Sequence, residues 1–209
     1  MPTSTTTGNA HPIHAALYDP VMGLVDRAGL AEKRRRLVAG AAGEVVEVGG
    51  GTGRNLALYR DVERVVVLEP DAAMRARLLG RVPSAAVPVE VHETGIEDTT
   101  LPDGFADTVV ACLVLCSVPS QETALAAIKR LLKPGGRLLF LEHVRSPGVR
   151  GRVQSAVTPV WSRTAGAGCH LDRRTLDAIR GAGFAITDCH RSGALVQGIA
   201  VPSTRFPSA

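Results

Sequence analysis

Four residues near the middle of an apolar stretch could do chemistry together: Glu47-x-Gly49-x-Gly51-x-Gly53. Glycine lets the backbone turn sharply and approach a ligand without a Cβ clash. A helix that begins after such a turn offers free N–H groups and a positive dipole end to an anion. The pattern predicts a binding turn for a nucleotide-like ligand. The alternative is a glycine-rich turn that binds nothing.

The spacing excludes two common ligand classes. A dinucleotide fingerprint, G-x-G-x-x-G, needs a third glycine where the chain has Arg54 or Leu56, and no Gly-Lys-Ser/Thr of a P-loop follows. A second acidic residue, Glu69, ends the apolar run 65–68. A carboxylate there can accept hydrogen bonds from both vicinal hydroxyls of a ribose. A solvated glutamate at a strand end is the alternative.

Taken with three later segments, the glycine motif resembles motif I of the class I S-adenosylmethionine-dependent methyltransferases, in particular the type 11 group. These segments are Gly95-Ile96-Glu97, Phe105-x-Asp107 and the turn 132–136, Leu-Lys-Pro-Gly-Gly. Gly95 departs from the family, which usually has an acidic residue there. The resemblance covers residues 44–145 and implies S-adenosylmethionine as cofactor and S-adenosylhomocysteine as product. It implies these contacts with the cofactor: Glu47, Gly49, Gly51, Gly53, Glu69, Pro70, Ile96, Glu97, Cys112 and Leu113.

The C-terminal half is similar to the methyltransferase-like family that includes animal alkyl-thiol methyltransferases. The similarity rests on Leu-Cys-Ser-Val at 115–118, Leu-Glu-His-Val at 141–144 and Gly-Cys-x-Leu-x-Arg-x-Thr at 168–175. A looser similarity connects the chain with quinone-biosynthesis C-methyltransferases. This chain lacks the N-terminal membrane segment of the alkyl-thiol enzymes, which favours a soluble, different substrate.

Two histidines are candidate catalytic bases. His143 follows an apolar run and His170 flanks the segment 144–172, and either could accept a proton from a thiol, phenol or amine. Each could instead orient a loop or pack in the core. Tyr18 and Trp161 are candidate substrate contacts, with plain packing as the alternative for both. Glu142 is expected to pair with substrate or with Arg173.

Composition limits the partners. The net charge is +4, and the longest basic run, 33–36, is interpreted as a solvated helix face, so nucleic-acid or membrane binding has no support. Aromatic content of 3% argues against a stacking platform for single strands. The four cysteines form no C-x-x-C pair, which suits a reducing cytosol. Cys112 and Cys116 are expected to be small buried hydrophobic residues, with a nucleophilic or metal role as the alternative, and no metal is expected. No signal peptide or membrane-spanning run is found, which favours a cytoplasmic protein.

Alternating strand and helix patterns predict an α/β fold: a Rossmann-like, seven-stranded, mostly parallel sheet with helices on both faces. We expect residues 1–10 to be disordered and 11–209 to form one methyltransferase domain. Within it, 11–40 should form two lid helices, 56–60 should continue a helix after the glycine turn, and 145–168 should be an irregular insertion within the substrate-side segment 144–172. Asp71, Ser120 and Asp172 are expected to cap helices.

These observations predict an enzyme that transfers a methyl group to an O, N, S or C atom of a small molecule. The activated sulfonium methyl needs mainly a well-placed nucleophile. Two alternatives remain open: methylation of protein or RNA, and a non-catalytic scaffold subunit that keeps the cofactor fold. The absence of Asp/Asn-Pro-Pro-Tyr around 111–114 disfavours action on DNA bases. The chain is expected to be a monomer or a homodimer.

Overall fold

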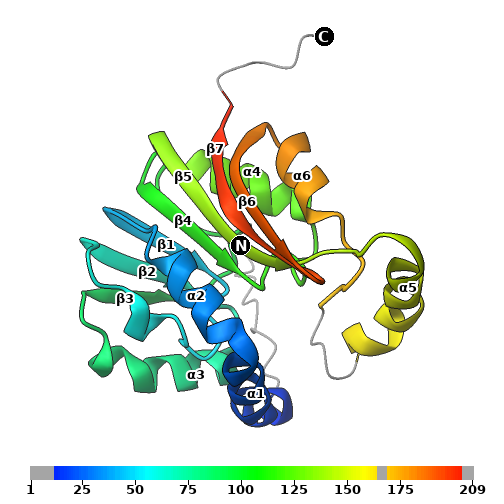
Figure 1. Ribbon diagram of the computed structural model, residues 1–209. Coiled ribbons are helices and arrows are strands. Elements are labelled where there is room, and N and C mark those ends of the chain that lie inside the picture. The colour runs from blue at the N-terminus through cyan, green and yellow to red at the C-terminus, as the bar shows by residue number, and fades with distance from the viewer. Residues whose placement is uncertain (1–11, 164–168, 204–209) are drawn as a thin grey trace, which may run out of the picture.

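The computed structural model describes residues 12–163 and 169–203, and its central feature is a seven-stranded sheet in the order β3-β2-β1-β4-β5-β7-β6 (Figure 1). Neighbouring strands from β3 to β5 run parallel, and β7 runs antiparallel to β5 and β6. This confirms the predicted fold class. The strands are β1 Glu44–Val48, β2 Arg64–Leu68, β3 Val89–His92, β4 Ala106–Cys112, β5 Leu132–His143, β6 Phe184–Ser192 and β7 Leu195–Pro202.

Helices cover both faces of the sheet, α2 in front and α4 behind in Figure 1. Successive strand residues point to opposite faces, so Val45 joins an apolar cluster with Leu37 of α2, and Val46 joins a second cluster with Leu125 of α4. The helices are α1 Pro12–Val25, α2 Ala31–Val38, α3 Ala72–Arg81, α4 Gln121–Leu131, α5 Gly148–Arg163 and α6 Thr175–Gly181. Because β2, β1 and β4 are parallel neighbours in the sheet, the loops at their carboxyl ends lie at the same edge.

The N-terminal segment forms two helices, α1 and α2, joined by the π-helical turn Asp26–Leu30. Gly29 breaks the helical path there with φ 111°. The apolar residues Val21 and Leu24 of α1 are more than half exposed, whereas Leu37 and Val38 of α2 are buried against the sheet.

Three local expectations were wrong. No α-helix follows the glycine turn: a single 3-10 turn, Leu56–Leu58, stands there, because the backbone becomes extended at Tyr59 to bury its ring. Within the range 145–168, which was expected to be irregular, residues 148–163 form helix α5 with Pro159 inside it, and residues 164–168 lie outside the described part of the chain. Asp172 caps no helix, because α6 begins only at Thr175. Asp71 and Ser120 do cap α3 and α4 through bonds to backbone amides.

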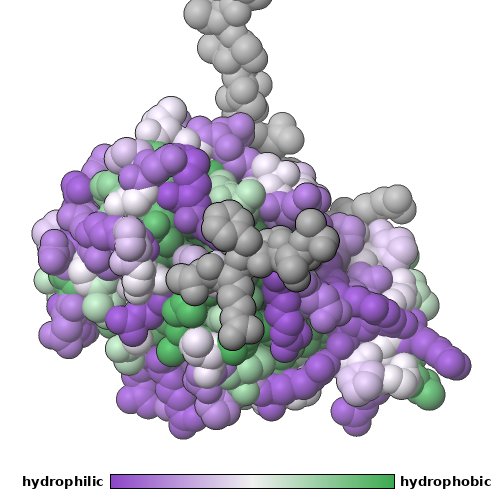
Figure 2. Space-filling model, turned by 90° about the horizontal axis from the view of Figure 1, so that it is seen from above, coloured by the Kyte–Doolittle hydropathy of each residue, from purple (hydrophilic) through white to green (hydrophobic). Residues whose placement is uncertain are grey.

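Residues 1–10, expected to be disordered, lie outside the described residues. Across 12–163 and 169–203, no helix has both the length and the apolar character of a membrane span. The surface seen from above in Figure 2 is mostly hydrophilic, with smaller hydrophobic areas between the polar residues.

Candidate functional site

The glycine turn after β1 has the backbone conformation that only glycine adopts easily. Gly49, Gly51 and Gly53 have φ angles of 63°, 57° and 79°, in the left-handed region that disfavours other L-residues. Glu69, at the end of β2, fixes this turn: its Oε2 accepts the amide of Gly51 at 2.7 Å, and its Oε1 accepts the amide of Asp71 at 2.8 Å. One carboxylate thus connects the two loops.

The turn is closely packed on one side and open on the other. A Cβ on Gly49 would lie 2.4 Å from Val114 Cγ2, and one on Gly50 would lie 2.2 Å from Val67 Cγ1. At Gly51 the nearest atom would be the hydroxyl oxygen of Tyr18, 3.9 Å away. The open side of the turn therefore faces α1.

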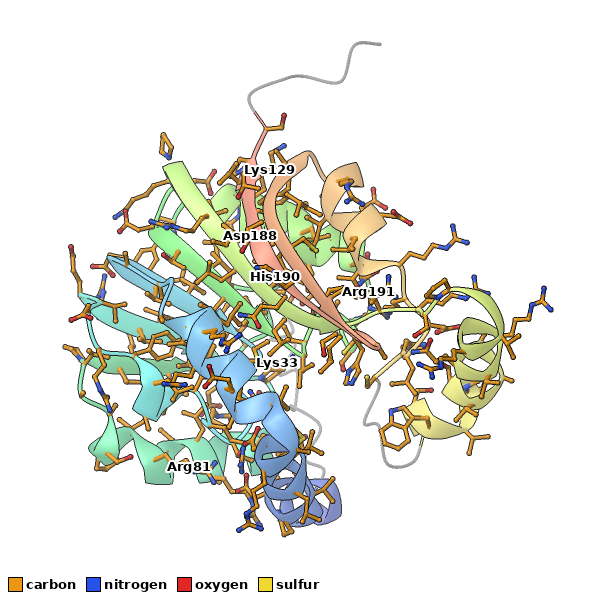
Figure 3. The ribbon with its side chains drawn as sticks, in the orientation of Figure 1. Lys33, Arg81, Lys129, Asp188, His190 and Arg191 are labelled. Atoms are coloured by element: carbon orange, nitrogen blue, oxygen red, sulfur yellow. The ribbon has the colours of Figure 1, made fainter. Side chains whose placement is uncertain are left out.

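Asp19 attaches α1 to this turn. Its carboxylate accepts Thr52 Oγ1 at 2.8 Å, Arg54 Nη1 at 3.1 Å and Arg81 Nη2 at 2.8 Å. Figure 3 shows Arg81 on α3 beside α1. Burial alone would raise the pKa of Asp19, but the bonds from Thr52 and Arg81 outweigh it and lower the pKa. The N-terminal helix is therefore held over the glycine turn by charged contacts.

Glu47 is buried beneath the turn and binds protein groups with both oxygens. Oε1 accepts Asn55 Nδ2 at 2.8 Å, and Oε2 accepts the Tyr59 hydroxyl at 2.9 Å. Burial raises the pKa of Glu47 to about 7 in spite of these bonds and the charge of Arg34. These contacts are those of a residue that positions the turn.

Arg34 contacts residues of the candidate site and was not among the site residues expected from the sequence. It is 5% exposed, so the expectation of a solvated face for 33–36 was wrong at this position. Its Nη1 donates to Asn55 Oδ1 at 3.1 Å and to Cys112 Sγ at 3.2 Å. Its Nη2 is buried with no hydrogen-bond partner in the described part of the chain. The helical spacing of Leu30, Arg34 and Leu37 was the available signal.

The segment after β3 contributes one apolar and one acidic residue. Ile96 is 1% exposed. Glu97 Oε1 is buried and has no hydrogen-bond partner among the residues described. A Cβ at Gly95 would lie only 3.2 Å from Glu97 Oε2, so the departure from the family at Gly95 gives this carboxylate room. Pro70, the remaining predicted contact on this side, is exposed.

The carboxyl end of β4 is strained. Leu113 has φ 60°, the only positive φ of a non-glycine residue in the described ranges, and its amide donates to Leu141 O at 2.7 Å. Such strain costs about 1–3 kcal/mol and gathers at functional sites. Burial raises the pKa of the preceding Cys112 thiol to about 12, so the thiol stays neutral.

Glu142 and Arg173 hold the loop 114–118 rather than each other. The fully buried Glu142 carboxylate accepts the amides of Val114, Leu115 and Cys116 at 3.0, 2.8 and 3.1 Å. Arg173 donates to the carbonyls of Leu115 and Val118 at 2.8 and 2.7 Å. The two expected roles of Glu142, pairing with Arg173 or with substrate, give way to loop support, because both of its oxygens accept backbone amides.

Both candidate bases contact Cys116, His143 through its ring and His170 through its backbone amide. The His143 ring lies beside Cys116 and Cys169, and its pKa is raised: burial lowers it, but bonding to Cys116 and the charges of Cys116 and Glu142 outweigh that effect. His170 contributes its backbone amide, which donates to Cys116 O at 2.8 Å. Trp161 lies on α5, away from the glycine turn in sequence, and is 37% exposed.

A basic pocket of about 260 Å³ lies between the end of β5 and α6. Arg191 of β6 points toward this region in Figure 3 and donates to Arg145 O at 2.7 Å. Other arginines line the pocket as well: Arg145, Arg173, Arg174 and Arg180.

Comparison with known proteins gives related sequences and folds. The family described as "Methyltransferase domain" matches residues 46–140. Human thiol S-methyltransferase TMT1B is 36% identical over 154 residues, 70% of this chain and 63% of that protein, so the chain spans less than two thirds of it. Human TMT1A is 33% identical over 168 residues, 74% of this chain and 68% of that protein.

Two further proteins are similar to this chain, one in sequence and one in fold. Phosphatidylethanolamine N-methyltransferase of Cereibacter sphaeroides is 31% identical over 148 residues, 68% of this chain and 71% of that protein. Among solved structures, the DhpI–SAH complex has a TM-score of 0.66 at 22% identity and covers 93% of this chain and 94% of that one.

Proposed function

We propose a cofactor site and an activity for this chain, which belongs to the class I S-adenosylmethionine-dependent methyltransferases. It binds S-adenosylmethionine at the carboxyl edge of β1, β2 and β4, and it methylates a small molecule. The observation that carries the cofactor site is a pair of buried groups without partners among the described residues: Arg34 Nη2 and Glu97 Oε1. Leaving a buried donor or acceptor unpaired costs about 1–3 kcal/mol. A ligand that pairs with both removes that cost.

The chemistry of the two groups fits the two ends of the cofactor. S-adenosylmethionine carries a carboxylate at its methionyl end, to which a guanidinium can bind. Its adenine carries an exocyclic amine, which can donate a hydrogen bond to a carboxylate. Arg34 donates a hydrogen bond to Cys112, the last residue of β4, and Glu97 lies in the loop after β3. The glycine turn lies on β1 between them in the sheet order.

The remaining contacts follow from the same edge. Each Glu69 oxygen uses one acceptor position for a backbone amide and keeps another for a ribose hydroxyl. Ile96 and Pro70 flank the adenine, and a carbonyl at Cys112 or Leu113 accepts the methionyl ammonium. Glu47 acts through Asn55 and Tyr59 as a positioning residue.

The bound cofactor supplies a methyl group on a sulfonium, which is already activated. The chain's own task is to hold the acceptor in line, exclude water and remove a proton where the acceptor carries one. We assign the closing of the site to α1 with Tyr18, and proton acceptance to the ring of His143. His170 and Trp161 belong to the segment that shapes the acceptor side.

A small acceptor, with a thiol as the first class to test, is supported by the human relatives, whose names give thiol S-methylation. The phosphatidylethanolamine enzyme keeps an amine as the second class. Four free cysteines, three of them buried, are typical of a reducing compartment and support a cytoplasmic location.

Calorimetric titration with S-adenosylmethionine and S-adenosylhomocysteine tests the cofactor site. We expect the wild type to bind both and Glu97→Ala to lose about tenfold or more, equivalent to about 1.4 kcal/mol. Glu93→Ala is the matched control, because Glu93 lies in the same loop with its side chain 77% exposed. A folded wild type that binds neither compound would refute the proposal, as would equal affinity of Glu97→Ala and wild type.

Transfer itself is tested with radiolabelled methyl groups and a panel of thiols, phenols and amines. Labelled product from one class identifies the acceptor atom. If the protein binds the cofactor but methylates no thiol, phenol or amine, the alternative of a non-catalytic scaffold subunit is favoured.

A further inference from the structure

Three soft donor atoms from three separate segments meet in the interior near the carboxyl end of β5. They are the Sγ of Cys116 in the loop after β4, the Nδ1 of His143 at the end of β5, and the Sγ of Cys169 shortly before α6. The distances are 3.3 Å between the two sulfurs, 3.7 Å from Cys169 Sγ to Nδ1 and 4.0 Å from Cys116 Sγ to Nδ1. Both cysteines are at most 9% exposed.

These separations are close to the edges of a zinc tetrahedron. With Zn–S of about 2.3 Å and Zn–N of about 2.0–2.1 Å, tetrahedral angles give about 3.8 Å between two sulfurs and about 3.6 Å between sulfur and nitrogen. The three observed separations lie within about half an ångström of these values. Two thiols and an imidazole are also a usual donor set for zinc.

We propose that Cys116, His143 and Cys169 form a binding site for a thiophilic divalent cation, with Zn²⁺ as the expected ion. Binding releases a proton from each thiol, so two thiolates balance the charge of the ion. His143 binds through Nδ1 as a neutral ring that keeps its proton on Nε2, so in the metal-loaded protein this ring donates a hydrogen bond and does not act as the proton acceptor.

Hydrogen bonds already hold the Cys116 backbone beside the segment that carries Cys169. Glu142 accepts the Cys116 amide at 3.1 Å, and the His170 amide donates to Cys116 O at 2.8 Å. The second bond joins the loop that carries Cys116 to the segment that carries Cys169. The site therefore forms with little rearrangement, which favours binding.

Three protein ligands leave one coordination position open, as in catalytic zinc sites. That position would take water or, where the proposed function holds, the thiolate of an acceptor. This second role rests on the proposed function, whereas metal binding itself does not.

Cobalt substitution tests the site directly. Protein stripped with a chelator under reducing conditions is titrated with Co²⁺, and the near-ultraviolet thiolate-to-cobalt charge-transfer band is recorded. We expect saturation at one equivalent, reversal by Zn²⁺, and loss of the band in Cys116→Ser and in Cys169→Ser. Zn²⁺ affinity should fall in both variants by more than the roughly 10–100-fold that loss of an outer-shell partner costs.

Cys189→Ser is the matched control, since Cys189 is an exposed free cysteine on β6; it should keep the band. Circular dichroism and titration with S-adenosylmethionine in each variant separate loss of metal from loss of fold or cofactor site. A folded wild type without the band would overturn the metal site, as would a band that survives in Cys116→Ser and Cys169→Ser. A native mass two hydrogens lighter, from a Cys116–Cys169 disulfide, would also overturn it.

Discussion

Replacing Glu47 by Gln should change the pH dependence of stability in a direction that the structure fixes. Burial raises the pKa of this carboxyl from 4.5 to about 7, so the folded protein binds the proton more tightly than the unfolded chain. The resulting stability is fully present below pH 4.5, falls as the pH rises to about 7 and is constant above. A difference of about 2.5 pH units, at 1.36 kcal/mol each, corresponds to about 3 kcal/mol.

Urea unfolding of ligand-free protein between pH 5 and 8 measures this effect. Gln has the shape of Glu and does not titrate, so the free energy of unfolding of Glu47→Gln, relative to wild type, should rise by about 2–3 kcal/mol across that range. Glu63→Gln is the control at an exposed position, and its free energy of unfolding should depend on pH as that of the wild type does. A constant difference between Glu47→Gln and wild type at every pH would refute the argument that burial disfavours the charged carboxylate.

Two other perturbations give distinct outcomes. Gly50→Ala would place a Cβ 2.2 Å from Val67 Cγ1, and should cost about 1–3 kcal/mol in urea unfolding through overpacking. Gly51→Ala has open space around the new Cβ but φ 57°, so it should lower the free energy of unfolding by about 1 kcal/mol and mainly weaken S-adenosylmethionine binding in calorimetry. A larger loss of stability at Gly51 than at Gly50 would contradict this. Glu142→Gln turns an amide NH₂ toward a backbone N–H of the loop 114–118, and should cost about 1–3 kcal/mol; an unchanged urea midpoint would be inconsistent with that role.

The fold could be predicted because its signals are local. Short runs of valine and leucine with helical patterns between them predict a parallel α/β sheet, and Asp71 and Ser120 do cap helices as expected. The errors arose where distant contacts overrule local pattern. Tyr59 leaves the expected helix because its hydroxyl bonds to Glu47, and no periodicity over 56–60 reveals that partner.

The site was predictable only where a motif is continuous in sequence. The glycine turn and Glu69 are neighbours in a motif, and the structure connects them by a hydrogen bond. Arg34 was hidden in a run of four basic residues, of which Arg35 and Arg36 pair with Glu32 at the surface. A charge run predicts a solvated face on average, but one helical position in such a run can still point inward.

Cys116, His143 and Cys169 illustrate the same limit more strongly. Their spacings of 27 and 26 residues resemble no metal motif, so sequence reasoning favoured buried thiols without a metal. The order of the sheet brings them together: β4 and β5 are neighbouring parallel strands, so the loops after both lie at one edge, and the chain returns to that edge at Cys169. A donor set assembled in this way is a property of topology, and the cobalt titration therefore tests a prediction that only the three-dimensional arrangement could supply.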